Sequence, residues 1–167
     1  MLPIAHLLGG FLVLVPFLAT GLETTGSLLL LTALLSVFPD IDTAWNETLA
    51  DHHASLLHTP VFWVAPSLVI AAAGHPHPAY VALAAPLFHL CCDYVTGRSS
   101  GVMLFFPLTT DEYALYPIDR SKGDFDPLQP DPEQLVAYLS DYLQSPVQVV
   151  FELGVAVLGG SVLLFLL

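Results

Sequence analysis

The feature that most constrains this chain is a set of five long apolar runs, at residues 4–20, 24–38, 60–74, 79–95 and 147–167. The sequence is 55 % hydrophobic and only 11 % charged. A membrane-spanning helix needs about 20 apolar residues, within a tolerated range of roughly 17 to 25. We therefore predict an all-α integral membrane protein with about four or five transmembrane helices.

Some of these segments are expected to be half-spans. The second and third runs are short, and Pro16, Pro66 and Pro86 lie inside the first, third and fourth runs. Each proline removes a backbone hydrogen-bond donor and favours a kink. A soluble protein with buried helices is the competing interpretation, but the last run, with Glu152 as its only charge, has too little polar surface for that.

The runs suggest three parts: a helical membrane core at 1–108, an acidic loop at 109–146 and a C-terminal transmembrane helix at 147–167. Within the loop, Asp131 followed by Pro132 is typical of a helix start. Five residues then share one side of that helix at helical spacing: Leu135, Val136, Leu139, Tyr142 and Leu143. Such a helix either lies at the membrane interface or packs over the loop.

The charge balance limits the possible partners. The net charge is −12, and the only cations are Arg98, Arg120 and Lys122. Nucleic-acid binding through a basic surface is therefore not expected, and the expected partners are the lipid bilayer and a small-molecule or lipid substrate. All three cations follow the fourth run, so the positive-inside tendency predicts a multi-pass cell-membrane protein with that face in the cytoplasm.

Seven residues with metal-ligating side chains lie near the ends of the apolar runs: His6, Asp40, Asp42, His53, His58, His89 and Asp93. Because the runs alternate in direction, an even number of crossings separates His6 from each later group. All seven are therefore predicted to meet at one membrane face. The turns at 21–25 and 74–78 belong to the opposite face.

Each group has a simpler interpretation when taken alone. His89 and Asp93 are four apart and face the same side of a helix, but they could form only a hydrogen-bonded pair. Asp40 and Asp42 follow Pro39 and could cap a turn. The histidines before the third run could be solvated at the interface. The predicted convergence of all seven favours a metal site instead.

The expected cofactor is a divalent metal ion. A mixed histidine and aspartate set without thiolates suits zinc, manganese or iron. Seven ligands could also hold two ions about 3.5 to 4 Å apart, as in two-metal hydrolytic sites.

These motifs resemble the LexA-binding, inner-membrane-associated family of membrane-bound, metal-dependent hydrolases over roughly residues 1–108. The family has a histidine before its first helix, as His6 here, and then Pro-Asp-Ile-Asp, matched by 39–42. It continues with His-Arg-Gly-x-Thr-His-Ser, and residues 53–59 of this chain keep both histidines of that motif at the same spacing. The next family motif is His-x-x-x-Asp, which His89 and Asp93 match. The later Thr, Gly and aromatic-Pro are matched by Thr96, Gly101 and 106–107.

The chain departs from this pattern between its two histidines, where Ala54, Ser55 and Leu57 replace Arg, Gly and Thr. If that arginine holds an anionic substrate, this chain has lost it or uses Arg98 instead. The resemblance implies a metal-dependent hydrolase. Our leading hypothesis is hydrolysis of an ester or phosphoester at the membrane interface by metal-activated water, with one uncoordinated carboxylate as general base. The sequence does not decide which carboxylate. A non-catalytic, metal-stabilised scaffold or regulator remains the alternative, and a metal or proton transporter is less favoured.

Overall fold

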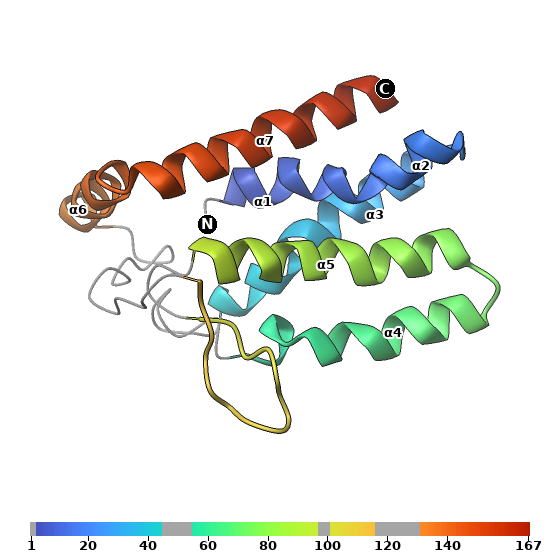
Figure 1. Ribbon diagram of the computed structural model, residues 1–167, viewed down its shortest axis with the longest axis horizontal. Coiled ribbons are helices and arrows are strands. Elements are labelled where there is room, and N and C mark those ends of the chain that lie inside the picture. Colours follow the sequence, from blue (N-terminus) through green and yellow to red (C-terminus); the bar gives the residue numbers. More distant parts are fainter. Residues whose placement is uncertain (1–2, 45–54, 97–100, 116–130) are drawn as a thin grey trace.

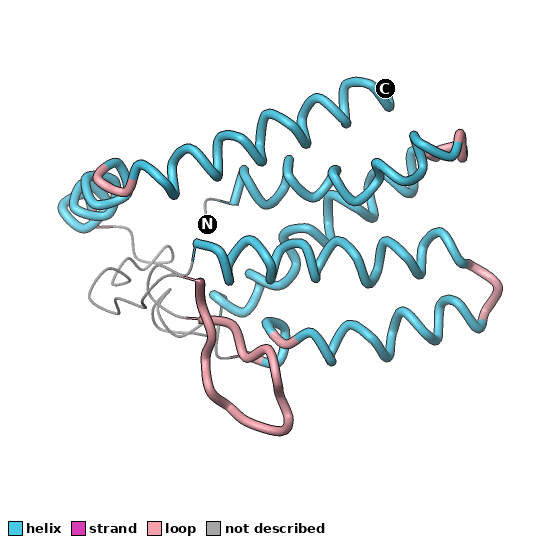
Figure 2. The backbone as a smooth tube through the Cα atoms, in the orientation of Figure 1, coloured by secondary structure: helices cyan, strands magenta, loops and turns pink. Residues whose placement is uncertain are grey.

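The computed structural model describes residues 3–44, 55–96, 101–115 and 131–167. Within these ranges the regular elements are all helices, and the β-type pairing is a single isolated bridge between Val102 and Tyr113. Figures 1 and 2 show the helices as one bundle. The predicted all-α fold is confirmed.

In chain order the helices are α1 (Pro3–Gly9), the 3₁₀ helix η1 (Gly10–Leu14), α2 (Val15–Thr20), α3 (Gly26–Val37), the 3₁₀ helices η2 (Phe38–Ala44) and η4 (Leu56–His58), α4 (Pro60–Ala72), α5 (Pro76–Thr96), α6 (Pro132–Leu143) and α7 (Pro146–Leu166). Each apolar run of the sequence therefore becomes helical.

Three of these segments are long and apolar enough to cross a membrane: Pro3–Thr20, Pro76–Thr96 and Pro146–Leu166. Helices α3 and α4 have only 12 and 13 residues. At 1.5 Å per residue they extend about 18 to 20 Å, which is less than the roughly 30 Å of a bilayer's hydrocarbon core. Both helices are shorter than a full span, and the expectation that some of the segments are half-spans stays a prediction.

The prolines affect these helices differently. Pro66 and Pro86 lie inside α4 and α5 without ending them. Pro16 follows η1, where the first segment tightens to 3₁₀ geometry. The Tyr80 hydroxyl of α5 donates to the Val13 carbonyl oxygen in this segment at 2.9 Å, as expected where a neighbouring helix satisfies irregular backbone in a membrane protein.

The apolar helices run roughly along one direction, so the bundle has two ends (Figure 1). Helix α5 packs against α3 and α4, and α1 packs against α3 and α7. The turns at one end contain Gly21 and Gly74, whose φ angles of 67° and 86° favour glycine. The opposite end holds η2, η4, α6 and the start of α7. The chain therefore threads back and forth as the sequence predicts.

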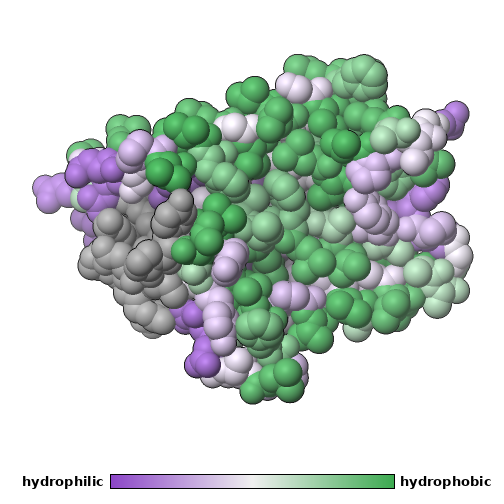
Figure 3. Space-filling view, in the orientation of Figure 1, coloured by the Kyte–Doolittle hydropathy of each residue, from purple (hydrophilic) through white to green (hydrophobic). Residues whose placement is uncertain are grey.

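The interior and exterior of the bundle are both apolar. Phe11, Leu14 and Phe17 of the first segment form a core with Leu28, Val81 and Ala85. The visible outer surface is hydrophobic over the helices and more polar at the two ends (Figure 3). Only 11 % of the apolar stretch of α7 is buried against the rest of the protein. This exposed apolar surface fits a lipid environment.

Two glycines allow helices to approach closely. A Cβ atom on Gly159 of α7 would meet the Leu8 carbonyl oxygen of α1, and one on Gly10 would meet the Ser36 hydroxyl of α3. Small residues at such crossings let membrane helices pack backbone to backbone. These contacts hold α7 and α3 against the first segment.

We expect Gly159→Ala to lower the stability of the protein in detergent by about 1 to 3 kcal/mol, because its Cβ would overlap the backbone of α1. The matched control is Gly160→Ala, since nothing lies within 4 Å of a Cβ built there. Thermal unfolding of both variants measures the difference. Equal melting temperatures would show that α7 does not pack on α1 in this way.

Candidate metal centre

Helix ends and 3₁₀ turns at one end of the bundle place the predicted ligands. Helix α3 continues into η2, which carries Asp40 and Asp42. His58 ends η4, directly before Thr59 and the start of α4 at Pro60. His89 and Asp93 lie one turn apart on α5, and His6 lies on α1.

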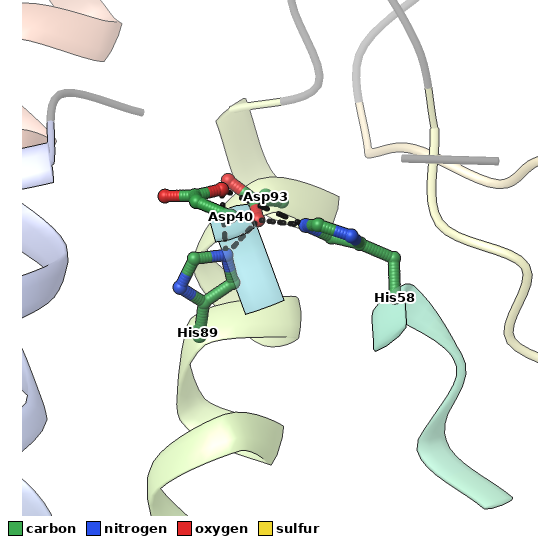
Figure 4. A group of neighbouring side chains, drawn as sticks. All are labelled: Asp40, His58, His89 and Asp93. Atoms are coloured by element: carbon green, nitrogen blue, oxygen red, sulfur yellow. Dashed lines mark ion pairs between the residues drawn. The ribbon is translucent and has the colours of Figure 1, made fainter. Parts of the chain in front are cut away.

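Four of these residues form a compact group that could hold a metal ion: Asp40, His58, His89 and Asp93. One ligand atom from each lies within 4.8 Å of the other three. His89 Nε2 lies 3.2 Å from Asp40 Oδ1 and 3.0 Å from Asp93 Oδ2. His58 Nε2 lies 3.7 Å and 3.8 Å from the same two oxygens. Figure 4 shows both imidazoles pointing at the two carboxylates.

The second ring nitrogen of each histidine has its own partner. His89 Nδ1 lies 2.8 Å from the Ser36 carbonyl oxygen, an acceptor only, so this nitrogen carries the proton. His58 Nδ1 lies 3.0 Å from Asp42 Oδ2. An ionised carboxylate is also only an acceptor, so this nitrogen carries a proton as well. In the neutral rings, both Nε2 atoms then present lone pairs to carboxylate oxygens.

A nitrogen lone pair at this distance repels the carboxylate oxygen that it faces, unless a cation lies between the two atoms. His89 Nε2 is buried without a regular hydrogen bond. No Lys or Arg occurs in the described ranges to supply the missing positive charge. Burial alone would lower the pKa of His58, but the neighbouring carboxylates of Asp40, Asp42 and Asp93 raise it above the ordinary value. The group therefore favours a bound cation, and its residues fit a divalent metal ion.

Asp42 lies behind His58, and its Oδ2 atom contacts the nitrogen that points away from the group. Ser55 donates its hydroxyl to the same Asp42 oxygen and accepts a hydrogen bond from the Leu57 amide at 3.2 Å. A carboxylate behind a ligand histidine fixes the ring and raises its basicity. This position suits an orienting role for Asp42 better than direct ligation.

His6 lies beside the four-residue group. Its ring stacks on His89, with ring centroids 3.7 Å apart and planes 17° from parallel. His6 Nε2 is 3.0 Å from Asp93 Oδ1, the oxygen turned away from His58 and His89. Asp93 thus joins His6 to the other two histidines.

The structure brings together six of the seven residues that the sequence predicted as ligands: His6, Asp40, Asp42, His58, His89 and Asp93. His53, the seventh, lies outside the described residues, as does Arg98. The roles of the Ser36 carbonyl and of Ser55 were not predicted. A backbone acceptor leaves no side-chain signal, and Ser55 stood out only as a replacement in the family motif.

Residues 1–163 match the family model described as YdjM inner membrane protein. No curated protein and no solved structure matches the chain. The match covers almost the whole sequence and agrees with the multi-pass helical architecture.

Proposed function

This chain belongs to the YdjM inner membrane protein family, and we propose that it is a membrane-bound, metal-dependent hydrolase of an ester or phosphoester at the membrane interface. The observation that carries the proposal is the convergence of Asp40, His58, His89 and Asp93 at one end of the bundle. The donor set of imidazoles and carboxylates without thiolates suits zinc, manganese or iron.

We assign different roles to the buried and exposed members of the group. His58, His89 and Asp93 hold the ion from positions closed to solvent, whereas the Asp40 side chain is 23 % exposed. When bound, a divalent ion polarises the oxygen of the scissile group and favours the deprotonated form of water. Asp40, which water can reach, accepts the proton from the attacking water.

Supporting residues complete the proposed site. Asp42 and the Ser36 carbonyl orient His58 and His89, and His6 holds Asp93. Arg98, Arg120 and Lys122 follow α5, whose last residues lie at the same end as the cluster. By the positive-inside tendency we propose that this end faces the cytoplasm.

The proposal predicts that Asp40→Asn lowers hydrolysis by roughly 10² to 10⁴-fold, the usual contribution of a general base, while the metal content stays measurable. The assay uses detergent-purified protein loaded with zinc, manganese or iron and a panel of nitrophenyl esters and phosphoesters. The matched control is Glu23→Gln, an exposed carboxylate in the turn at the opposite end. Metal-loaded protein that cleaves none of the panel would contradict the hydrolase assignment.

A non-catalytic scaffold is the second candidate, and burial is the observation that favours it. The side chains of His58, His89 and Asp93 are fully shielded, as expected for a structural ion that ties helices together. In that case metal removal lowers the melting temperature, and Asp40→Asn changes no reaction. A transporter is less favoured, because transport sites usually lie near the bilayer midplane and this cluster lies toward one end.

A further inference from the structure

Helix α6 carries an apolar face that the described part of the chain does not cover. Leu135, Val136, Leu139 and Leu143 lie at helical spacing on one side and are between 39 % and 70 % exposed. The predicted helix start is present, because Asp131 accepts a hydrogen bond from the Glu133 amide at 2.9 Å. A helix with one exposed apolar side and one polar side is typical of a membrane surface.

The direction of α6 fits such a surface. Figure 1 shows α6 nearly end-on, whereas α7 and the rest of the bundle run across the view. Helix α6 ends at Leu143 and α7 begins at Pro146. Because this link is short, α6 must lie close to the first turn of α7, which is a candidate membrane span. A helix that crosses the end of such a bundle lies parallel to the membrane plane.

A buried contact also fixes the rotation of α6. The Tyr142 hydroxyl donates to Glu152 Oε2 at 3.1 Å, and Gln148 Nε2 donates to Glu152 Oε1 at 2.9 Å. Glu152 lies six residues after the first residue of α7, about 9 Å along the helix, and is buried. Tyr142 therefore points toward the side into which α7 runs.

The exposed leucines lie next to Tyr142 on the helix surface. Leu135 and Leu139 precede Tyr142 by seven and three residues, which places them on neighbouring positions. Glu133 and Asp141 fall on the other side. The apolar face is thus turned toward the bilayer and the carboxylates toward water.

We propose that α6 is an interfacial helix, with Val136, Leu139 and Leu143 among the upper acyl chains of the bilayer that α7 crosses. The helix contains two acidic residues, Glu133 and Asp141, and no Lys or Arg. Its attachment is therefore apolar and does not require anionic lipid, unlike that of basic amphipathic helices. The Tyr142–Glu152 contact and the link to α7 hold it in place.

Spin labels on full-length protein in phosphatidylcholine nanodiscs test this surface. Single cysteines replace Val136, Leu139, Leu143 and, as the polar-side control, Asp141, in a background with Cys91→Ala and Cys92→Ala. Labels on the apolar face are expected to collide several-fold more often with oxygen, which concentrates in lipid, than with a water-soluble nickel chelate. The label at 141 is expected to show the reverse.

Three outcomes would overturn the proposal. Preferential collision with nickel at all four positions would place α6 in water. Protection of the apolar positions from both reagents would show that another part of the chain covers them. Oxygen access that appears only with phosphatidylglycerol, or that is lost in high salt, would make the attachment electrostatic. Because none of these readouts involves metal or hydrolysis, they are independent of the proposed function.

Discussion

Asp93→Ala is expected to abolish specific divalent-metal binding, with a loss in affinity of more than about 100-fold. This loss is larger than the usual effect of replacing a residue that only supports a ligand. Asp93 contacts all three histidines of the cluster. One oxygen lies 3.0 Å from His6, and the other lies 3.0 Å from His89 and 3.8 Å from His58. The substitution removes a ligand atom and one of the two negative charges of the four-residue group.

Metal content after dialysis and titration calorimetry of the metal-free protein measure this effect. Glu23→Ala is the matched control, because Glu23 is an exposed carboxylate at the opposite end of the bundle. Circular dichroism and gel filtration in detergent establish that both variants remain folded. A folded Asp93→Ala protein with the metal content of the unsubstituted protein would rule out this cluster as the binding site.

Asp42→Asn is expected to weaken metal binding by about 10 to 100-fold, because Asp42 acts on the ion only through His58. The amide keeps the shape of the side chain and can still accept from the ring. It lacks the negative charge that raises the basicity of His58. Calorimetric titration of the purified variant with zinc and manganese gives the affinity.

Variants of neighbouring residues show whether Asp42 orients His58 or binds the ion directly. Ser55→Ala, which removes a hydrogen bond to Asp42, should have a smaller effect in the same direction. A loss for Asp42→Asn as large as that for Asp93→Ala would make Asp42 a direct ligand, as the sequence alone suggested. An unchanged affinity would remove Asp42 from the site altogether.

Hydrophobic patterning predicted the fold well because a bilayer restricts the choices. Apolar runs in lipid must satisfy their backbone internally, so they become helices, and their alternation places His6 and Asp93 at the same end. The helix start at Asp131 follows from local capping chemistry and is also confirmed. Length alone identified α3 and α4 as short segments.

Packing details were less accessible from the sequence. A count of crossings places a residue at one end of a helix but does not say which atoms face each other. Asp42 was therefore grouped with the ligands although it contacts the outer nitrogen of His58. The contact of Glu152 with Tyr142 of α6, and the burial of Glu152, were not predicted. Both outcomes depend on tertiary contacts between distant segments.

X-ray absorption at the metal edge of zinc-loaded protein tests most directly whether the histidines and aspartates of the cluster hold the ion. We expect nitrogen and oxygen neighbours at about 2.0 to 2.2 Å with imidazole scattering and no sulfur, and the loss of this signal in His89→Ala. Cys91 and Cys92 lie between His89 and Asp93 on α5, so a thiolate site is the nearest rival. A sulfur neighbour at about 2.3 Å, or a spectrum unchanged by His89→Ala, would rule out the proposed metal centre.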